Sequence, residues 1–269
     1  MANVLLTNAC NRKCAYCFAR VRMLQDGFER LDLSFDSLVT VADFLAAEGI
    51  ARFSMIGGEP SLHPDFPVFV RYLVRRGFLV RVFTNGTWPA EFVDELAECI
   101  PPRSLRLIVN LNGPELRDEA HGERQRHLLE RLPASTLLSV NLYQPGLSLD
   151  YLPETYSRYG LSKELRISLT HPILGSSTEG APSRSVLGQL ARDIVGLSDA
   201  LAPIGVRLVL DCGFPLCMFD DAQIGRLYRN NARLRFTCSP VIDIASDLEV
   251  WPCFPLGSLK VGRLDRFES

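Results

Sequence analysis

The alternation of strands and helices restricts the folds open to this chain more than any other feature of its sequence. Short apolar runs predict strands at residues 3–7, 51–56, 78–86, 104–111, 136–143 and 164–170. Amphipathic patterns predict helices after them at residues 34–48, 64–76, 89–99, 115–132, 150–159 and 184–201. Six such units in succession favour parallel strands joined by right-handed helical crossovers.

Chain length decides between a closed and an open barrel. An eight-unit barrel typically needs about 250 residues, whereas the six predicted units end near residue 205. We therefore predict an α/β fold with a partial (β/α)6 TIM-like barrel over residues 1–205. Residues 206–269 are predicted to form a small extension made of a β-hairpin and a helix.

The composition excludes several classes of protein. The 269 residues are 47% hydrophobic and carry a formal net charge of −2, which suits a globular protein and gives no electrostatic reason to expect a nucleic-acid partner. No run of about 18 uncharged apolar residues predicts a membrane span. The N-terminus lacks the basic region of a signal peptide, so we expect a cytoplasmic protein. In that reducing compartment the eight cysteines indicate metal or redox chemistry rather than disulfides.

Four turns follow the first four predicted strands. They are the loop around residues 8–17, "GGEP" at 57–60, "TNG" at 84–86 and "NLNG" at 110–113. In parallel α/β folds, ligands bind beyond the carboxyl ends of the strands. The four turns are therefore expected to meet at one rim and to form the binding site there.

The first of these turns carries three cysteines, Cys10, Cys14 and Cys17, in Cys-x3-Cys-x2-Cys spacing. Cysteine thiolates are the usual ligands of iron–sulfur clusters, and a cubane has four irons, so three thiolates would leave one iron open. Two alternatives stay open at this point. They are a zinc site that lacks its fourth ligand and three unrelated thiols.

With Tyr16 just before the last cysteine and "GGEP" after the next strand, this motif resembles the radical S-adenosylmethionine (radical SAM) enzymes. The resemblance implies that Cys10, Cys14 and Cys17 each bind one iron of a [4Fe–4S] cluster. The open iron would be chelated by the amino and carboxylate groups of S-adenosylmethionine. Tyr16 would lie near the adenine.

The resemblance also implies roles for the turns after the second, third and fourth strands. The "GGEP" turn would receive the methionine amino group, since glycines let the backbone come close and a carboxylate pairs with an ammonium. By itself this turn could be an ordinary one. The cofactor-binding residues predicted in the three turns are Gly57, Gly58, Glu59, Pro60, Asn85 and Asn110. Asn110 corresponds to a ribose-contacting position, whereas Asn85 could equally satisfy backbone groups of a turn.

The last 64 residues contain four of the eight cysteines, Cys212, Cys217, Cys238 and Cys253. Residues 238–253 predict a β-hairpin across an Ala-Ser-Asp turn, with Ile242 and Ile244 against Leu248 and Val250. The hairpin resembles the start of the twitch and SPASM extensions of radical SAM enzymes, although Leu248 stands where that family usually has glycine. The resemblance implies that the four cysteines hold a second, auxiliary [4Fe–4S] cluster. A zinc site with four cysteine ligands is the alternative.

Three other polar or reactive positions have simpler explanations. Cys99 lies in the apolar run of a predicted helix, so we expect it in the core. His63 precedes a proline and is expected to cap a turn or lie on the rim. Asp220 begins a segment that reads as a helix start.

The resemblance implies an enzyme, an oxidoreductase or maturase. Reductive cleavage of S-adenosylmethionine would give a 5′-deoxyadenosyl radical that abstracts hydrogen from the substrate, with flavodoxin or ferredoxin as the reducing partner. The first substrate hypothesis is a peptide or protein side chain, modified by oxidation, crosslinking or epimerisation. The second is dehydrogenation of a small metabolite such as an amino sugar. A non-enzymatic redox sensor or scaffold is the third.

Overall fold

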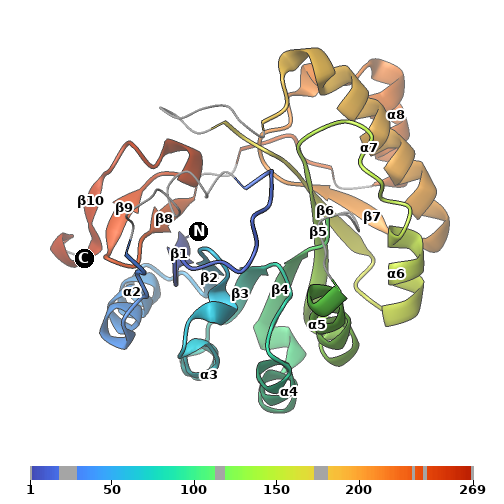
Figure 1. The fold of residues 1–269 in the computed structure, drawn as a ribbon. Coiled ribbons are helices and arrows are strands. Elements are labelled where there is room, and N and C mark those ends of the chain that lie inside the picture. The colour runs from blue at the N-terminus through green and yellow to red at the C-terminus, as the bar shows by residue number, and fades with distance from the viewer. Residues whose placement is uncertain are drawn as a thin grey trace.

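A computed structural model describes residues 2–17, 29–112, 119–172, 181–231, 234–238 and 241–267 of the chain. Within them, one strongly curved ten-stranded sheet has the order β10-β9-β8-β1-β2-β3-β4-β5-β6-β7, with helices around its outside (Figure 1). None of the described helices combines the length and the apolar character needed to cross a membrane.

The central strands all pair in parallel. They are β1 (Ala2–Leu5), β2 (Arg52–Ile56), β3 (Leu79–Thr84), β4 (Leu105–Asn110), β5 (Thr136–Leu142), β6 (Glu164–Leu169) and β7 (Arg207–Leu210). The α/β fold class and the first six strands are confirmed. Strand β7 was not predicted. Its four residues "RLVL" alternate between exposed and buried, and the apolar run at 208–210 is only three residues long.

The helices connect these strands and cover one face of the sheet (Figure 1). They are α2 (Phe35–Ala47), α3 (Phe66–Arg75), α4 (Ala90–Cys99), α5 (Glu119–Arg131), α6 (Leu152–Tyr159), α7 (Leu187–Leu201) and α8 (Asp221–Asn230). Two of these helices begin at the capping residues that the sequence predicts. Ser34 caps α2 by accepting a hydrogen bond from the Ser37 backbone, and Asp220 forms a capping box with Gln223 at α8. Residues 115–118 of the predicted fifth helix lie outside the described residues.

Strand β3 shows how each strand presents two faces. Val80 and Val82 are fully buried in the apolar core between sheet and helices. Arg81 and Phe83 alternate with them, are half-buried and belong to the opposite face. We call this opposite face the inner face of the sheet. It is the concave side, away from the helices (Figure 1).

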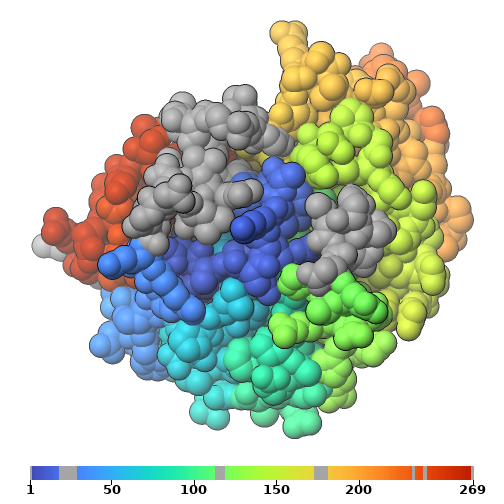
Figure 2. Space-filling model, viewed as in Figure 1, coloured from blue at the N-terminus to red at the C-terminus, as the bar shows by residue number. Residues whose placement is uncertain are grey.

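The C-terminal strands extend the same sheet beyond β1. They are β8 (Ile242–Ile244), β9 (Glu249–Trp251) and β10 (Gly262–Arg263). Strand β8 pairs with β1 in parallel and with β9 in antiparallel fashion. In space-filling view the N-terminal residues lie between these strands and the side formed by the later helices (Figure 2). Strands β7 and β8 both belong to the same sheet as the barrel strands, so the sheet continues across the domain boundary predicted at residue 205. That boundary stays a prediction.

The hairpin differs from its prediction at one residue. Ile244 pairs with Val250, and Leu248 lies in the turn, where its backbone N–H donates to Ala245 O at 2.9 Å. The predicted strand pairing of Leu248 is therefore wrong. Leu248 has φ of 68°, the left-handed conformation that favours glycine, at the position where the resemblance implied glycine. This conformation costs a side chain roughly 1–2 kcal/mol, and the burial of Leu248 offsets it.

Candidate functional site

Two loops meet closely at the carboxyl ends of β1 and β2. The backbone N–H of Gly58 donates to Thr7 O at 2.8 Å, and that of Glu59 donates to Ala9 O at 2.7 Å. A Cβ added at Gly58 would lie 2.0 Å from Ala9 O, and one at Gly57 would lie 2.4 Å from Thr7 O. The glycines are therefore required because the "GGEP" turn is hydrogen-bonded directly to the backbone that leads into Cys10.

The three N-terminal cysteines are close enough to act on one another. Burial raises the pKa of the Cys10 thiol to about 11, with further contributions from Glu59, Cys17 and Cys14. The Cys17 backbone N–H donates to Cys14 O at 3.1 Å, which closes the loop. Three thiolates beside a carboxylate repel one another, and a cationic iron centre relieves that repulsion. The donor set therefore fits an iron–sulfur cluster.

Tyr16 joins this loop to the far side of the barrel. Its ring is buried and lies 5.5 Å from the Tyr143 ring, centroid to centroid, just after β5. Burial, and then the neighbouring Cys14, raise the pKa of the Tyr16 phenol well above its usual value. Tyr16 therefore stays neutral and presents an aromatic surface beside the cysteines. Its contact with adenine remains a prediction.

Glu59 has a structural role that sequence reasoning missed. Its Oε1 accepts hydrogen bonds from Thr84 Oγ1 at 2.7 Å and Trp88 Nε1 at 3.2 Å, besides two from Ser61. Its Oε2 accepts one from the Asn85 backbone at 2.7 Å. The side chain is fully buried, and this burial raises the pKa of the carboxyl group, although the hydrogen bonds act in the opposite direction. Glu59 thus joins the "GGEP" turn to the turn after β3.

We expect Glu59→Ala to destabilise the protein, because it leaves several buried donors without their acceptor at about 1–3 kcal/mol each. Glu59→Gln keeps one acceptor oxygen and should cost less. Urea unfolding measures both, with the exposed Glu98→Ala as control. Binding of S-adenosylmethionine should also weaken in Glu59→Ala, because the turn whose carbonyl groups would accept from the methionine ammonium loses the hydrogen bonds that hold it to the turn after β3. Wild-type stability in Glu59→Ala would contradict the structural role.

Asn85 connects the turn after β3 to the cysteine loop. Its Nδ2 donates to Asn11 Oδ1 at 2.8 Å, and its Oδ1 accepts from the Thr87 backbone at 2.9 Å. These bonds support the interpretation of Asn85 as a turn residue, and its contact with the cofactor remains a prediction. Pro60 is buried and opens a short 3-10 helix, Pro60–Leu62.

Asn110 ends β4 on the inner face of the sheet. Its Oδ1 accepts a hydrogen bond from Asn141 Nδ2 at 3.2 Å, so two amides from neighbouring strands lie together at the rim. Asn112, just beyond, exchanges two hydrogen bonds with the Asn141 backbone. The predicted ribose contact of Asn110 remains a prediction.

The structure tests the structural roles predicted for His63 and Cys99. His63 is buried, its Nε2 lies 2.9 Å from Leu33 O, and its Nδ1 accepts from the Asp65 backbone. Its capping role is confirmed. The core position predicted for Cys99 is wrong, because Cys99 is exposed at the end of α4. The buried face of that helix instead runs through Val93 and Leu96.

Three of the four C-terminal cysteines lie near enough for their charges to affect the pKa of a neighbouring thiol. Burial raises the pKa of the Cys212 thiol, followed by the effects of Asp211 and Cys238. Burial also raises the pKa of Cys253 to about 11, and Asp243, Cys212 and Cys238 add to it. Cys217 is exposed and is not among the main groups that act on either thiol. Among the described residues, no three His, Cys, Asp or Glu side chains surround a single metal-ion position.

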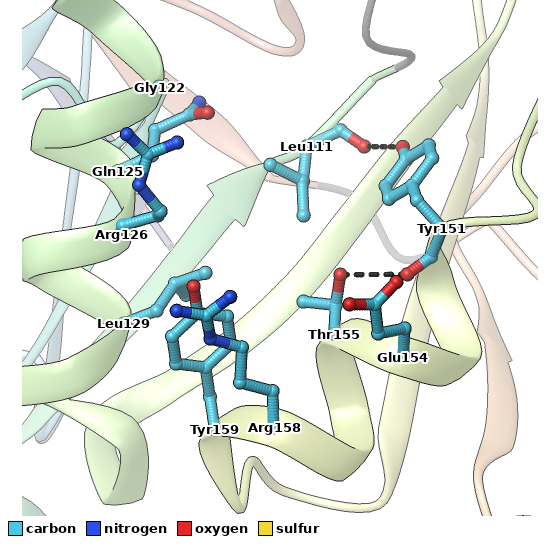
Figure 3. Close-up of a pocket in the computed structure, with 10 residues that line it drawn as sticks. All are labelled: Leu111, Gly122, Gln125, Arg126, Leu129, Tyr151, Glu154, Thr155, Arg158 and Tyr159. Atoms are coloured by element: carbon cyan, nitrogen blue, oxygen red, sulfur yellow. Dashed lines mark hydrogen bonds between the residues drawn. The ribbon is translucent and has the colours of Figure 1, made fainter.

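A separate pocket lies between α5 and α6 and is much smaller than a usual ligand site (Figure 3). Its volume is about 170 Å³, and Tyr151 OH, which donates to Leu111 O, closes one side. It contains none of the predicted site residues. Its lining residues are Leu111, Gly122, Gln125, Arg126, Leu129, Tyr151, Glu154, Thr155, Arg158 and Tyr159.

The chain forms a partial α/β barrel, and its three-cysteine loop is hydrogen-bonded to a glycine-rich turn at the carboxyl ends of the strands. These features define a class of cofactor-binding protein. Residues 4–132 match the family model described as the Radical SAM superfamily. The chain therefore carries a radical SAM domain, and the resemblance drawn from the cysteine motif is confirmed. This superfamily binds S-adenosylmethionine and a [4Fe–4S] cluster, which are the cofactors predicted for the N-terminal site.

Known proteins match part of the chain. The S-adenosylmethionine-dependent nucleotide dehydratase of Selenomonas ruminantium is 34% identical over 86 residues, which are 32% of this chain and 29% of that protein. The antilisterial bacteriocin subtilosin biosynthesis protein AlbA of Bacillus subtilis is 29% identical over 117 residues, which are 43% of this chain and 24% of AlbA. The chain therefore spans less than a third of either relative.

The solved structure of Streptococcus suis SuiB bound to S-adenosylmethionine has the same fold. It matches with a TM-score of 0.68 and 16% identity, over 98% of this chain and 63% of SuiB. SuiB bound to its precursor peptide SuiA matches with a TM-score of 0.67 and 14% identity, over 97% of this chain and 61% of SuiB. At these identities the likeness concerns the fold alone.

Proposed function

We propose that the protein is a radical SAM enzyme that cleaves S-adenosylmethionine reductively and abstracts a hydrogen atom from its substrate. The observation that carries this proposal is the pair of backbone hydrogen bonds from Gly58 and Glu59 to the segment leading into Cys10. They hold the expected amino-acid clamp against the expected cluster ligands. A redox sensor needs the cysteines but has no use for that clamp.

Each predicted residue then has one task. Cys10, Cys14 and Cys17 would hold the cluster, which together with S-adenosylmethionine supplies the reducing electron and the radical. The carbonyl groups of the "GGEP" turn would accept hydrogen bonds from the methionine ammonium. Tyr16 would shield the adenine from water. Formation of 5′-deoxyadenosine by the anaerobic, dithionite-reduced protein tests this proposal, and flavodoxin or ferredoxin would replace dithionite in the cytoplasm.

For the substrate, the peptide or protein side chain remains the first proposal. It is supported by the similarity to AlbA, which is named for bacteriocin biosynthesis, and by the fold shared with SuiB, whose structure includes a precursor peptide. The reaction would then be an oxidation, a crosslink or an epimerisation. A small metabolite is the alternative, and the similarity to a nucleotide dehydratase favours it.

Deuterium transfer is expected to separate these substrate classes. A peptide substrate labelled at the reacting carbon should pass deuterium to 5′-deoxyadenosine, which mass spectrometry detects as a gain of one mass unit per transfer. A small-metabolite enzyme should leave candidate peptides unlabelled and take deuterium from a sugar, amine or nucleotide instead. Failure of every class to transfer label would favour the sensor or scaffold.

We further propose that residues 206–269 form an auxiliary-cluster extension. Cys238 raises the pKa of both Cys212 and Cys253, and Cys212 raises that of Cys253, which supports a shared site. Trp251 and Phe254, which flank Cys253, are buried and pack edge to face at 6.3 Å. This packing would keep water from a cluster held there, and burial tunes cluster potentials. Cys217, which is exposed in the 3-10 helix Leu216–Met218, would be the fourth ligand of such a site.

A further inference from the structure

A closed ring of side-chain hydrogen bonds joins the turn after β3 to the cysteine loop. Asn85 Nδ2 donates to Asn11 Oδ1 at 2.8 Å, and Asn11 Nδ2 donates to Thr87 Oγ1 at 2.9 Å. The Thr87 hydroxyl in turn donates to Asn85 Oδ1 at 2.6 Å. Each side chain of this Asn11–Asn85–Thr87 ring therefore both donates and accepts, and hydrogen bonds arranged in such a chain polarise and strengthen one another.

The backbone of the turn supports the ring. Gly86, between Asn85 and Thr87, has φ of 74°, the left-handed conformation that favours glycine. Its N–H donates to Thr84 Oγ1 at 2.9 Å, and the Thr87 N–H donates to Asn85 Oδ1 at 2.9 Å. Thr87 is buried, so water has little access to take the place of its hydroxyl. Loss of that hydroxyl would therefore open the ring.

Asn11 occupies the spacer between the first two cysteines, directly after Cys10 and three residues before Cys14. The backbone bonds of Gly58 and Glu59 hold the segment that leads into Cys10, and the ring holds the segment that follows it. The cysteine loop is thus attached to the barrel on both sides of Cys10. Because ordering a loop costs conformational entropy, a loop that is already ordered can take up a ligand without that cost.

The same turn also holds the "GGEP" turn. The Asn85 backbone N–H donates to Glu59 Oε2 at 2.7 Å, and the Asn85 backbone O accepts from Gln125 Nε2 of α5 at 2.6 Å. Asn85 therefore contacts the cysteine loop through its side chain and the "GGEP" turn through its backbone. This arrangement fixes the two halves of the candidate site relative to each other.

We propose that Asn11, Asn85 and Thr87 are positioning residues whose ring holds the cysteine loop in the arrangement that binds S-adenosylmethionine. The inference rests on the proposed function, because S-adenosylmethionine would have to reach the open iron and the carbonyl groups of the "GGEP" turn at the same time. A loop that is in the competent arrangement only part of the time lowers the apparent affinity by that fraction. Asn11 and Thr87 thus act on the cofactor through the loop and need not touch it.

Hydrogen exchange of the full chain without its cluster tests the attachment of the loop, in a peptide that covers residues 10–17. Asn11→Ala opens the ring from the loop, and Thr87→Val removes the hydroxyl at nearly constant size. Both variants should exchange at least about tenfold faster than the wild type in this peptide, the effect of one lost hydrogen bond. Thr87→Ser keeps the hydroxyl and should exchange at the wild-type rate. Thr40→Val is the matched control, since it removes a hydroxyl that donates to Asp36 O within α2.

The affinity of the reconstituted protein for S-adenosylmethionine is the second measurement. It is read from the change that S-adenosylmethionine causes in the electron paramagnetic resonance spectrum of the reduced cluster. Thr87→Val keeps all three thiols and should still acquire the cluster, but should bind at least about tenfold more weakly. Thr87→Ser should bind as the wild type does.

A peptide from β5, residues 136–142, separates a local effect from a general loss of stability, and it should exchange at the wild-type rate in every variant. The proposal is overturned if Asn11→Ala or Thr87→Val keeps wild-type exchange in residues 10–17, or if β5 accelerates equally. It is also overturned if Thr87→Ser behaves like Thr87→Val, or if Thr87→Val binds S-adenosylmethionine with wild-type affinity. Faster exchange in the loop, with a wild type that forms no 5′-deoxyadenosine, would instead refute the proposed function alone.

Discussion

Replacing Cys14 by alanine is expected to abolish the formation of 5′-deoxyadenosine. The cluster needs three protein thiolates to keep one iron open for S-adenosylmethionine, and two thiolates cannot hold it in that state. The substitution removes the thiol but keeps the backbone carbonyl that accepts from Cys17, so the loop should retain its shape. The protein is reconstituted without oxygen and reduced with dithionite, and the product is measured by chromatography.

Cys99→Ala is the matched control for this experiment. Cys99 is exposed at the end of α4 and lies outside both groups of cysteines, so its loss should leave the rate unchanged. Turnover at the wild-type rate in Cys14→Ala would refute the radical mechanism. A loss of activity in both variants would point to a general sensitivity to cysteine replacement and would require the same test at Cys10 and Cys17.

The second large effect is expected in the iron content. Two cubanes correspond to about eight irons per chain, and a triple alanine variant at Cys10, Cys14 and Cys17 should retain about four. Cys253→Ser should also lose about four irons, because it removes a ligand of the C-terminal site. Cys212 and Cys253 variants should keep the slow, substrate-free cleavage of S-adenosylmethionine and lose product formation.

Cys217 decides between three and four thiolate ligands at that site. Since Cys217 is exposed and is not among the main groups that act on Cys212 or Cys253, we expect Cys217→Ser to retain about eight irons. A fall to about four irons would show that Cys217 completes the site, as the sequence predicts. One tightly bound zinc in the triple variant, with no iron, would make the extension a structural zinc site and leave the barrel chemistry intact.

The elements that the sequence predicted well are those whose signals are local. Strands such as residues 51–56 and 136–143 appear as short, mostly apolar runs, and helices begin at capping residues such as Ser34. Strand β7 escaped prediction because an edge strand is exposed on one side. Leu248 was misplaced because its burial, which comes from the folded core, outweighs the preference of its turn for glycine.

The sequence by itself determined the class of cofactor at the N-terminal site. Its three thiolates lie within eight residues, so one loop can position them and their spacing is readable in the chain. The same holds for the two glycines that let the next turn approach this loop. The geometry of a short loop can be inferred from the spacing of its residues in the sequence, and composition adds little to that inference.

Only the tertiary structure decided what comes from distant segments. Glu59 accepts hydrogen bonds from Thr84, Asn85 and Trp88 because β2 and β3 are neighbouring strands. The spacing of these residues in the sequence does not predict the bonds. The alternation of residues along a strand could assign Arg166 to one face of the sheet. Only the register and curvature of the sheet place its guanidinium over the Phe83 ring on β3. Cys212 follows β7 at one edge of the sheet and Cys253 follows β9 near the other, and the curvature of the sheet brings them near enough for Cys212 to raise the pKa of Cys253.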